Sequence, residues 1–210
     1  MSELKPEQNY ENPNDFYTFE ETKRYENNSG MKKTQTELTN IILQLYFEET
    51  KNKTKEISIL DIGCGTGFSL EFLKNQGHYI NLIGIDPAKE MLKICKYKKF
   101  ECYLGDFENL PKEVINKKFD LIISISALQW ILTNKQEMEI KNLIKKIGKS
   151  IKSILKENGI IIIQYYPPEK NTTEILNSSF ERIGFFVKEY IYNKDNPKKQ
   201  KFFLILKNKC

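Results

Sequence analysis

Three glycines at alternate positions, Gly63, Gly65 and Gly67, follow a run of apolar residues that ends in Asp61 and Ile62. Glycines in such a turn let the backbone bend tightly and let a ligand lie directly against it. The β-branched residues before the turn are typical of a buried parallel strand, and the residues after it are typical of a helix. The pattern therefore predicts a nucleotide-type cofactor site at the carboxyl end of a strand.

The spacing of these glycines argues against a nicotinamide cofactor. The dinucleotide fingerprint G-x-G-x-x-G needs its third glycine where this chain has the bulky Phe68. The carboxylate of Asp61 would repel a pyrophosphate, whereas it would attract a cationic ligand without phosphate. S-adenosylmethionine carries a sulfonium and an ammonium group, so the charge balance favours it over NAD, and a nicotinamide oxidoreductase is the poorest alternative.

Two further acids fall at the ends of the next two predicted strands. Asp86 lies 21 residues beyond Gly65 (86 − 65), and an acid at this strand end can accept hydrogen bonds from both ribose hydroxyls. Asp106 follows the third predicted strand and can accept a hydrogen bond from the adenine amino group, with Phe107 beside the ring. Acids at three successive strand ends are a more specific signal than a glycine motif alone.

The fourth predicted strand leads into the segment Ser124–Trp130, beside the first strand, where ligands of open α/β sheets bind. The segment lacks the Asp/Asn-Pro-Pro-Tyr motif of base-amine methylation. None of the four cysteines follows a proline, as pyrimidine C5 methylation would typically need. Oxygen acceptors usually need a base or a metal, and neither is evident here. Guanine N7 remains, because its free lone pair needs alignment and desolvation more than deprotonation.

Three residues of this segment are candidates for positioning the acceptor, with no general base expected. Trp130, the only tryptophan, can stack on a base, and Gln129 can read a base edge. Alternatively, Trp130 is a partly buried aromatic residue that covers the cofactor. Ser126 is the third acceptor candidate and Ser124 a candidate cofactor contact, although small residues at a strand end more often serve packing.

Composition narrows the class of protein. The 210 residues include 33 basic and 28 acidic ones, a formal charge of +5 that permits an RNA partner without demanding one. The cysteines show no Cys-x-x-Cys spacing, which predicts reduced intracellular thiols and no metal site. The N-terminus has no apolar signal region, and no apolar run approaches a membrane span. We expect a soluble intracellular protein.

Alternating strands and helices must position these residues, which predicts a doubly wound α/β fold with a mostly parallel sheet. We expect an irregular arm at 1–15 and a single domain at 16–210. Tyr17 and Tyr25 lie on the first predicted helix, where they either contact the cofactor or serve packing. The predicted strands are 57–62, 81–86, 100–104, 119–125, 159–165, 185–192 and 202–206, of which the last two form an antiparallel hairpin. The predicted helices are 16–25, 31–49, 67–76, 88–96 and 136–156.

With these segments assembled, the chain resembles the small-subunit (18S) rRNA guanine-N7 methyltransferases of eukaryotic ribosome biogenesis, from about Pro13 to Leu206. The segments that carry the resemblance include Phe16-Tyr17, Lys23-Arg24-Tyr25, Leu60–Gly67, Gly77-His78-Tyr79, Gly84-Ile85-Asp86 and, most specifically, Ser124–Trp130. The resemblance implies a class I Rossmann-like fold with seven strands, S-adenosylmethionine as cofactor, and a guanine N7 in small-subunit rRNA as acceptor. It also implies a heterodimer with a small zinc-binding activator subunit at the sheet edge near Phe100 to Leu104.

Two departures from the family pattern bear on the partners. Gly30 stands where the family usually has an arginine, and the family's long basic tail, which carries nuclear targeting and RNA affinity, is absent after Cys210. We expect a nuclear and cytoplasmic protein if the source is eukaryotic, and a cytoplasmic one if it is archaeal. The alternatives are a class I methyltransferase for a tRNA base or a small molecule, and a ribosome-assembly factor whose binding matters more than its catalysis.

Overall fold

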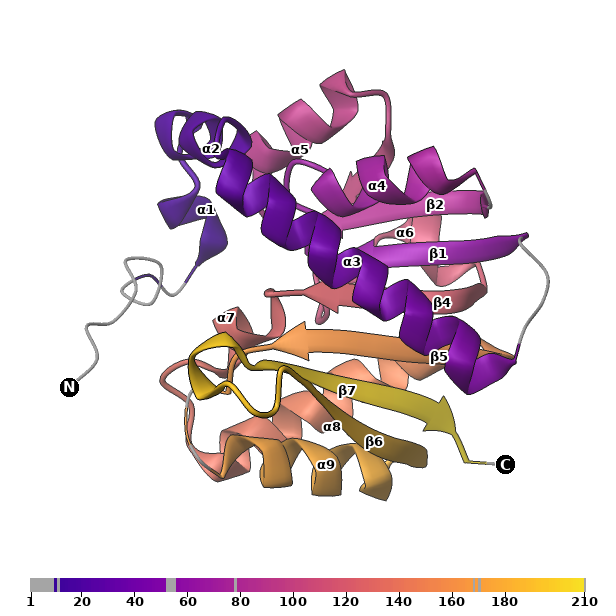
Figure 1. Cartoon of the computed structure of the whole chain (residues 1–210). Helices are drawn as coiled ribbons and strands as arrows, with labels where there is room; N and C mark the ends of the chain where they lie inside the picture. Colours follow the sequence, from indigo (N-terminus) through magenta and orange to yellow (C-terminus); the bar gives the residue numbers. More distant parts are fainter. Residues whose placement is uncertain are drawn as a thin grey trace.

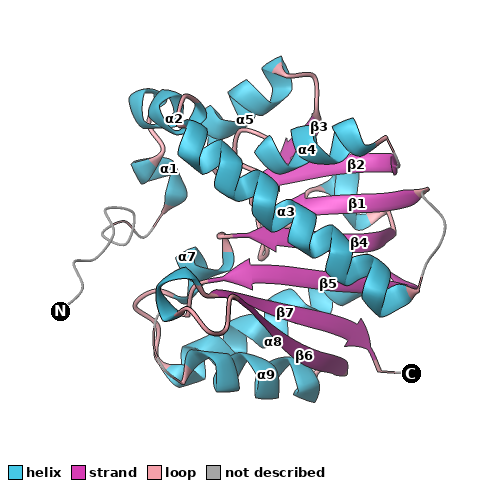
Figure 2. Ribbon diagram, in the orientation of Figure 1, coloured by secondary structure: helices cyan, strands magenta, loops and turns pink. Residues whose placement is uncertain are grey.

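The computed structural model describes residues 10, 12–51, 56–77, 79–167, 169 and 171–209. These residues form one seven-stranded sheet with helices on both faces (Figures 1 and 2). Most of the arm predicted at 1–15, together with His78 and Cys210, lies outside the described residues.

The sheet has the strand order β3-β2-β1-β4-β5-β7-β6, in which β7 runs in the opposite direction to the other six described strands. The prediction of a mostly parallel sheet that ends in an antiparallel hairpin is confirmed. The chain runs outward from β1 to β3 and then returns to place β4 on the other side of β1, which creates a topological switch point there. The strands are β1 (Ile57–Ile62), β2 (Tyr79–Asp86), β3 (Glu101–Leu104), β4 (Phe119–Ile125), β5 (Leu155–Tyr165), β6 (Phe185–Tyr192) and β7 (Lys201–Asn208).

Helices cover both faces of this sheet, as Figure 1 shows. The long helix α3 crosses one face, where Ile160 and Ile162 of β5 belong to the core, and α8 and α9 cover the other face, where Ile161 and Ile163 lie. Because successive side chains of a strand point to opposite faces, four isoleucines in a row fill both layers. The described helices are α1 (Pro13–Phe16), α2 (Phe19–Glu26), α3 (Ser29–Thr50), α4 (Phe68–Gln76), α5 (Lys89–Tyr97), α6 (Lys112–Ile115), α7 (Leu128–Leu132), α8 (Glu137–Ser153), α9 (Thr172–Arg182) and the 3₁₀ turn η2 (Pro197–Lys199).

The single helix predicted at 16–25 is wrong at its start, because the chain forms α1 and then, after a bend, α2. The side chain of Asn12 caps α1, and the side chain of Thr18 caps α2 by accepting a hydrogen bond from the backbone N of Glu21 at 3.3 Å. Because a second N-cap, Thr18, follows Asn12 after only six residues, the segment forms two short helices and not one continuous helix. Tyr17 therefore lies at the bend, and α1 falls partly within the segment predicted to be irregular.

The strand β5 begins at Leu155, four residues before the predicted start at 159. Leu155 pairs with Phe119, and the register between β4 and β5 then shifts within the polar stretch that follows. The helix predicted at 136–156 is therefore wrong at its end, because α8 ends at Ser153 and Leu155 and Lys156 belong to β5. In the structure, the ammonium of Lys156 lies 2.7 Å from a carboxylate oxygen of Asp120 and holds the stretch against β4.

The helix α9 is an element that the sequence patterns above do not predict. Its Ile175, Leu176 and Phe180 have helical spacing and are buried in the main core. Threonines, serines and asparagines surround these apolar residues, and such residues favour turns over helices in isolation. Packing against α8 and the sheet therefore decides the conformation of this segment.

Other sequence expectations concern cysteines and membranes. Cys64, Cys95 and Cys102 are free and buried, and their reduced state in the cell stays a prediction. Within the described ranges, the helices are either too short or too polar to cross a lipid bilayer. Among the same residues, no group of three acidic, histidine or cysteine side chains is arranged to hold a metal ion.

Candidate active site

A cavity of about 900 Å³ lies at the carboxyl ends of β1, β2 and β4. In Figure 1 the arrowheads of β4 and β5 point to the side of the molecule on which α1 and α7 lie. The structure brings most of the predicted site residues together around this cavity. They are Tyr17, Tyr25, Asp61, Gly63, Gly65, Asp86, Asp106, Phe107, Ser126, Gln129 and Trp130.

The glycine turn between β1 and α4 forms one wall of the cavity. Gly63, Gly65 and Gly67 have φ values of +84°, +55° and +87°, which a residue with a side chain adopts only at a cost. A Cβ atom placed on Gly65 would have the side chains of Tyr25 and Met91 as its nearest neighbours, at 4.0 Å. The backbone at Gly65 is therefore bare on the cavity side, where a ligand can lie against it.

Asp61 is the next-to-last residue of β1, beside this turn, and is only 1% exposed. One of its oxygens accepts a hydrogen bond from the hydroxyl of Ser69, and its Oδ1 has no hydrogen-bond partner among the described residues. Burial raises the pKa of Asp61 to about 7, the hydrogen bond from Ser69 opposes that rise, and the charge of Asp86 adds to it. A cationic or hydrogen-donating ligand group would compensate this buried carboxylate.

Asp86 lies at the end of β2 and joins two loops. Its Oδ2 accepts a hydrogen bond from the backbone N of Gly65 at 2.8 Å, and its Oδ1 accepts one from the backbone N of Ala88 at 2.8 Å. Burial raises the pKa of Asp86 to about 6, the two backbone hydrogen bonds oppose the rise, and the charge of Asp106 adds to it. Each carboxylate oxygen has a second lone pair, which can still accept a hydrogen bond from a ligand. The contact between Asp86 and the ribose hydroxyls stays a prediction.

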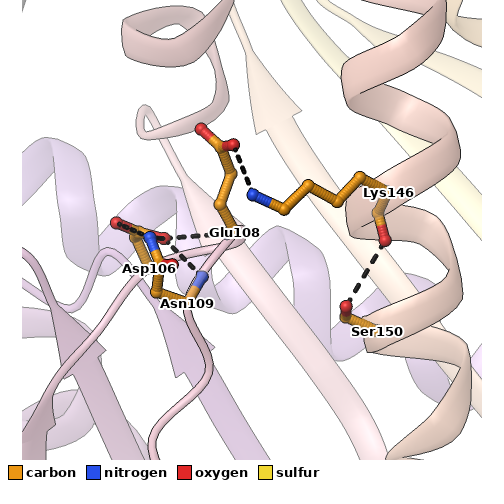
Figure 3. Close-up of polar contacts among 5 residues, drawn as sticks. All are labelled: Asp106, Glu108, Asn109, Lys146 and Ser150. Carbon is orange, nitrogen blue, oxygen red and sulfur yellow. Dashed lines mark hydrogen bonds and ion pairs between the residues drawn. The ribbon is translucent and has the colours of Figure 1, made fainter.

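Asp106 organises the loop after β3, as Figure 3 shows. Its Oδ1 accepts hydrogen bonds from the backbone N atoms of Glu108 at 2.7 Å and Asn109 at 2.8 Å. Glu108 forms an ion pair of 3.0 Å with Lys146 of α8, which ties the loop to that helix (Figure 3). The loop therefore holds Asp106 at the cavity, while its contact with adenine stays a prediction. The same holds for Phe107, which lines the cavity but packs largely into the main core.

On the acceptor side, β4 ends in a strained turn at Ser126, whose φ is +56°. The backbone N of Ser126 donates to the carbonyl oxygen of Gln164 at 3.1 Å, and its hydroxyl donates to Oε1 of Gln164 at 2.8 Å. Gln129 then donates from Nε2 to the carbonyl oxygen of Ser126 at 2.8 Å. The fully buried Gln164 of β5 thus fixes Ser126, and Ser126 fixes Gln129.

The amide of Gln129 points into this turn. Its Oε1 is buried and has no hydrogen-bond partner among the described residues. Because Nε2 is already used by Ser126, contact with a base edge would require the side chain to rotate. The reading of a base by Gln129 stays a prediction.

A row of aromatic rings connects the acceptor side to the glycine turn. The ring centre of Trp130 lies 5.8 Å from those of Phe16 and Tyr17. The ring of Tyr17 lies 6.1 Å from that of Tyr25, which stacks on Phe68 at 5.5 Å with an interplanar angle of 18°. These distances are typical of favourable aromatic pairs. The row offers flat, apolar surfaces on which adenine or an acceptor base can stack.

Two predicted site residues do not line the cavity. Ser124 is 1% exposed, and its hydroxyl has no hydrogen-bond partner among the described residues. A Cβ atom on Gly67 would lie 3.1 Å from the sulfur of Cys95 and 3.2 Å from the ring of Phe100. Gly67 is thus needed where α4 begins, because neighbouring side chains approach its backbone closely.

Several residues outside the predicted set line the cavity. One of them is Ala127, which follows the acceptor strand. A Cβ atom on Gly63 would lie 2.4 Å from the Cβ of Ala127, so the donor turn and the acceptor turn touch at this point. No local pattern connects these two positions. Phe68 and Ser69, by contrast, directly follow the glycine turn and could have been found from that adjacency. Further lining residues include Asn14, Gln35, Met91, Glu108 and Tyr166.

The residues of the donor side fit S-adenosylmethionine. Two buried carboxylates, Asp61 and Asp86, stand beside a backbone surface without side chains. A pyrophosphate there would face two like charges, whereas a cationic ligand would be attracted by both. The charges and the shape of this side of the cavity therefore both favour a cationic ligand without phosphate.

Comparison with protein-family models matches residues 53–204 to a family described as a methyltransferase domain. Among curated relatives, the 18S rRNA (guanine-N(7))-methyltransferase of Bos taurus is 30% identical over 196 residues, which cover 92% of this chain and 68% of that protein. The probable 18S rRNA (guanine-N(7))-methyltransferase of Dictyostelium discoideum is 31% identical over 199 residues, covering 92% of this chain and 67% of that protein.

A solved structure shares the fold over nearly the whole chain. The magnesium protoporphyrin IX methyltransferase of Synechocystis PCC 6803, solved with bound S-adenosylmethionine, has a TM-score of 0.65 to this chain. The match covers 99% of this chain and 100% of that one, at 13% sequence identity. At this identity the likeness concerns the fold, which is that of class I methyltransferases.

Proposed function

This chain belongs to the family of class I, S-adenosylmethionine-dependent 18S rRNA (guanine-N(7))-methyltransferases, and from that premise we propose that it methylates N7 of a guanine in small-subunit rRNA. The proposal includes a role in ribosome biogenesis, in the nucleus and cytoplasm of a eukaryotic cell. The choice of acceptor rests on the activity for which the relatives are named. The proposed chemistry rests on the residues that line the cavity.

The observation that carries the chemistry is the contrast between the two sides of the cavity. Around the turn after β4, no lining side chain ionises near neutral pH; the residues are Ile125, Ser126, Ala127, Gln129, Trp130 and Ile131. Guanine N7 has a free lone pair, so its methylation needs no base. Proximity and alignment alone can contribute about 7–11 kcal/mol to such a step.

S-adenosylmethionine, when bound, supplies an electrophilic methyl group. We assign its nucleoside part to Gly65, Asp86 and Tyr25, which offer bare backbone, a buried carboxylate and an aromatic ring. We assign its cationic part to the buried carboxylate of Asp61. Trp130 contributes a flat surface for the acceptor base, and its contacts with Phe16 and Tyr17 keep that surface in place.

Transfer of labelled methyl groups tests this proposal. The full chain is incubated with labelled S-adenosylmethionine and with either small-subunit rRNA or tRNA. The product is mapped by chemical cleavage at N7-methylguanine. We expect label at one guanine of the small-subunit rRNA. Label found only in tRNA or in small molecules would contradict the acceptor assignment and leave the cofactor assignment standing.

The partner that we propose is a small zinc-binding activator subunit at the edge of the sheet formed by β3. Among the strands that the structure describes, β3 pairs only with β2 and presents an open edge. Leu104 on this strand is 51% exposed and Tyr97 before it is 88% exposed. Open edges and exposed apolar side chains are features that a partner strand can cover. Co-purification from the native cell should yield a small zinc protein, and a Leu104→Asp variant should lose it.

A further inference from the structure

Four charged side chains from four segments meet beside the donor end of the cavity, and we refer to Glu26, Lys32, Glu71 and Lys98 as the Lys98 network. The ammonium of Lys98, directly after α5, lies 2.7 Å from a carboxylate oxygen of Glu26 at the end of α2. It also lies 3.9 Å from Glu71 of α4, which pairs with Lys32 of α3 at 2.8 Å. The side chains of Lys98 and Glu26 are only 19% and 25% exposed. Their attraction is therefore screened less than that of a surface pair.

The same network contacts an aromatic ring of the site. The ammonium of Lys98 lies 4.7 Å from the ring centre of Phe68, and that of Lys32 lies 5.8 Å from it. Phe68 is 3% exposed and stacks on Tyr25. A cation near the face of an aromatic ring is attracted by the ring, more strongly where water is excluded. Lys98 thus holds the ring on which Tyr25 rests.

The helix α2 has little apolar burial to fix its position. Thr22 is the one buried residue of its eight, and Phe19 at its start is 55% exposed. Most short helices are held on a domain by an apolar face. Beyond the stacking of Tyr25 on Phe68, α2 has little apolar burial, so polar contacts at its end contribute more. Glu26 is the α2 residue that Lys98 contacts.

Tyr25 is the α2 residue that reaches the bare backbone of the donor site. Its ring and hydroxyl are 4.0 Å from a Cβ atom placed on Gly65, and Tyr25 lines the cavity, whereas Lys98 does not. We propose that Lys98 is a positioning residue for the methyl donor: through Glu26 and Phe68 it keeps Tyr25 against the donor site. The inference rests on S-adenosylmethionine as the donor and does not depend on the identity of the acceptor.

Titration calorimetry of the full chain with S-adenosylhomocysteine tests this role. Lys98→Met keeps the apolar stem but removes the charge, and we expect the Kd to rise about tenfold. Lys98→Arg keeps the cation and should retain most of the affinity. The control is Lys207→Met, which removes another lysine that pairs with a glutamate at 2.7 Å, in this case Glu49, away from the cavity. The control should bind as the wild type does.

Two further measurements separate positioning from a general loss of structure. Glu26→Gln leaves Lys98 on Phe68 but breaks the ion pair, and should raise the Kd about threefold. In the methyl-transfer assay, Lys98→Met and Glu26→Gln should each raise the KM for S-adenosylmethionine and leave kcat little changed. An unchanged Kd in Lys98→Met or in Glu26→Gln would overturn the inference, and so would an equal loss of affinity in the Lys207→Met control.

If Lys98→Met does not fold, the Kd of Glu26→Gln alone tests the inference. Because the calorimetry uses no RNA, a wrong acceptor assignment would show only in the methylation assay.

Discussion

The donor turn at Gly63–Gly67 and the acceptor turn at Ser126–Trp130 both follow a parallel strand at the same edge of the sheet, yet they are built differently. The donor turn is formed by bare backbone, and its amide at Gly65 is held by the carboxylate of Asp86. The acceptor turn contains a residue with a side chain in the left-handed region, and hydrogen bonds to Gln164 hold it there.

This difference indicates how the two turns should respond to substitution. The donor turn offers a ligand its backbone, so an added side chain obstructs binding itself. The acceptor turn offers side chains, so removal of one should lower the rate with RNA and leave donor affinity unchanged. The close approach of Gly63 to Ala127 joins the two turns directly.

The strongest test of the donor half is Gly65→Leu. Its φ of +55° disfavours a side chain, and the new Cβ would enter the cavity next to Tyr25 and Met91. We expect the Kd for S-adenosylhomocysteine, measured by calorimetry, to rise by at least about 100-fold.

The matched control is Gly77→Leu at the other end of α4. Gly77 has a φ of +73°, and no described heavy atom lies within 4 Å of an added Cβ. This variant should lose about 1–2 kcal/mol of stability from backbone strain and bind the ligand normally. Equal loss of binding in Gly65→Leu and Gly77→Leu would show that strain, and not obstruction, is responsible.

Trp130→Ala tests the acceptor half. Stacking of a base on an aromatic side chain contributes about 1–3 kcal/mol, so kcat/KM for RNA should fall about 10–100-fold with the Kd for the donor unchanged. Trp130→Phe should retain part of the rate. If the donor Kd rises and the rate at saturating donor does not fall, then Trp130 covers the cofactor instead.

The pH dependence of donor binding should reveal the two buried carboxylates. The pKa values of Asp61 and Asp86 are raised from 3.8 to about 7 and about 6. Without ligand, these raised values contribute stability that is fully present below about pH 4 and is lost as the pH rises to about 7. A cationic donor favours the ionised carboxylates, so its affinity should increase about tenfold between pH 5.5 and 8.

S-adenosylhomocysteine provides the comparison, because it lacks the positive charge on sulfur. Calorimetry across the same pH range should show a weaker dependence for this compound and less proton release. The same pH profile for both compounds would argue that neither carboxylate senses the sulfonium.

The smallest expected effect belongs to Gln164→Leu. The substitution leaves the hydroxyl of Ser126 without its acceptor, which should cost about 1 kcal/mol of stability and reduce kcat with RNA about fivefold. Ser126→Ala removes the same hydrogen bond from the other side. The effects of the two substitutions should therefore not add in the double variant, and full additivity would contradict the coupling.

Much of the donor half could be predicted from the sequence. The glycine turn, its flanking Asp61, and Asp86 at the next strand end were all predicted, and the structure brings them to one cavity. Strand and helix boundaries in this half agree within a few residues. The reason is that glycine conformation and strand burial are properties of short contiguous segments, which the sequence displays directly.

Other features were decided by the tertiary structure. Ser126 is held by a residue 38 positions away, and the packing of α9 outweighs its weak helical composition. The bend at Tyr17 depends on two side-chain caps, and the role we propose for Lys98 depends on three segments that meet only in the folded chain. Such partners are chosen by the order of strands and the crossing of helices, and no local pattern in the sequence contains that information.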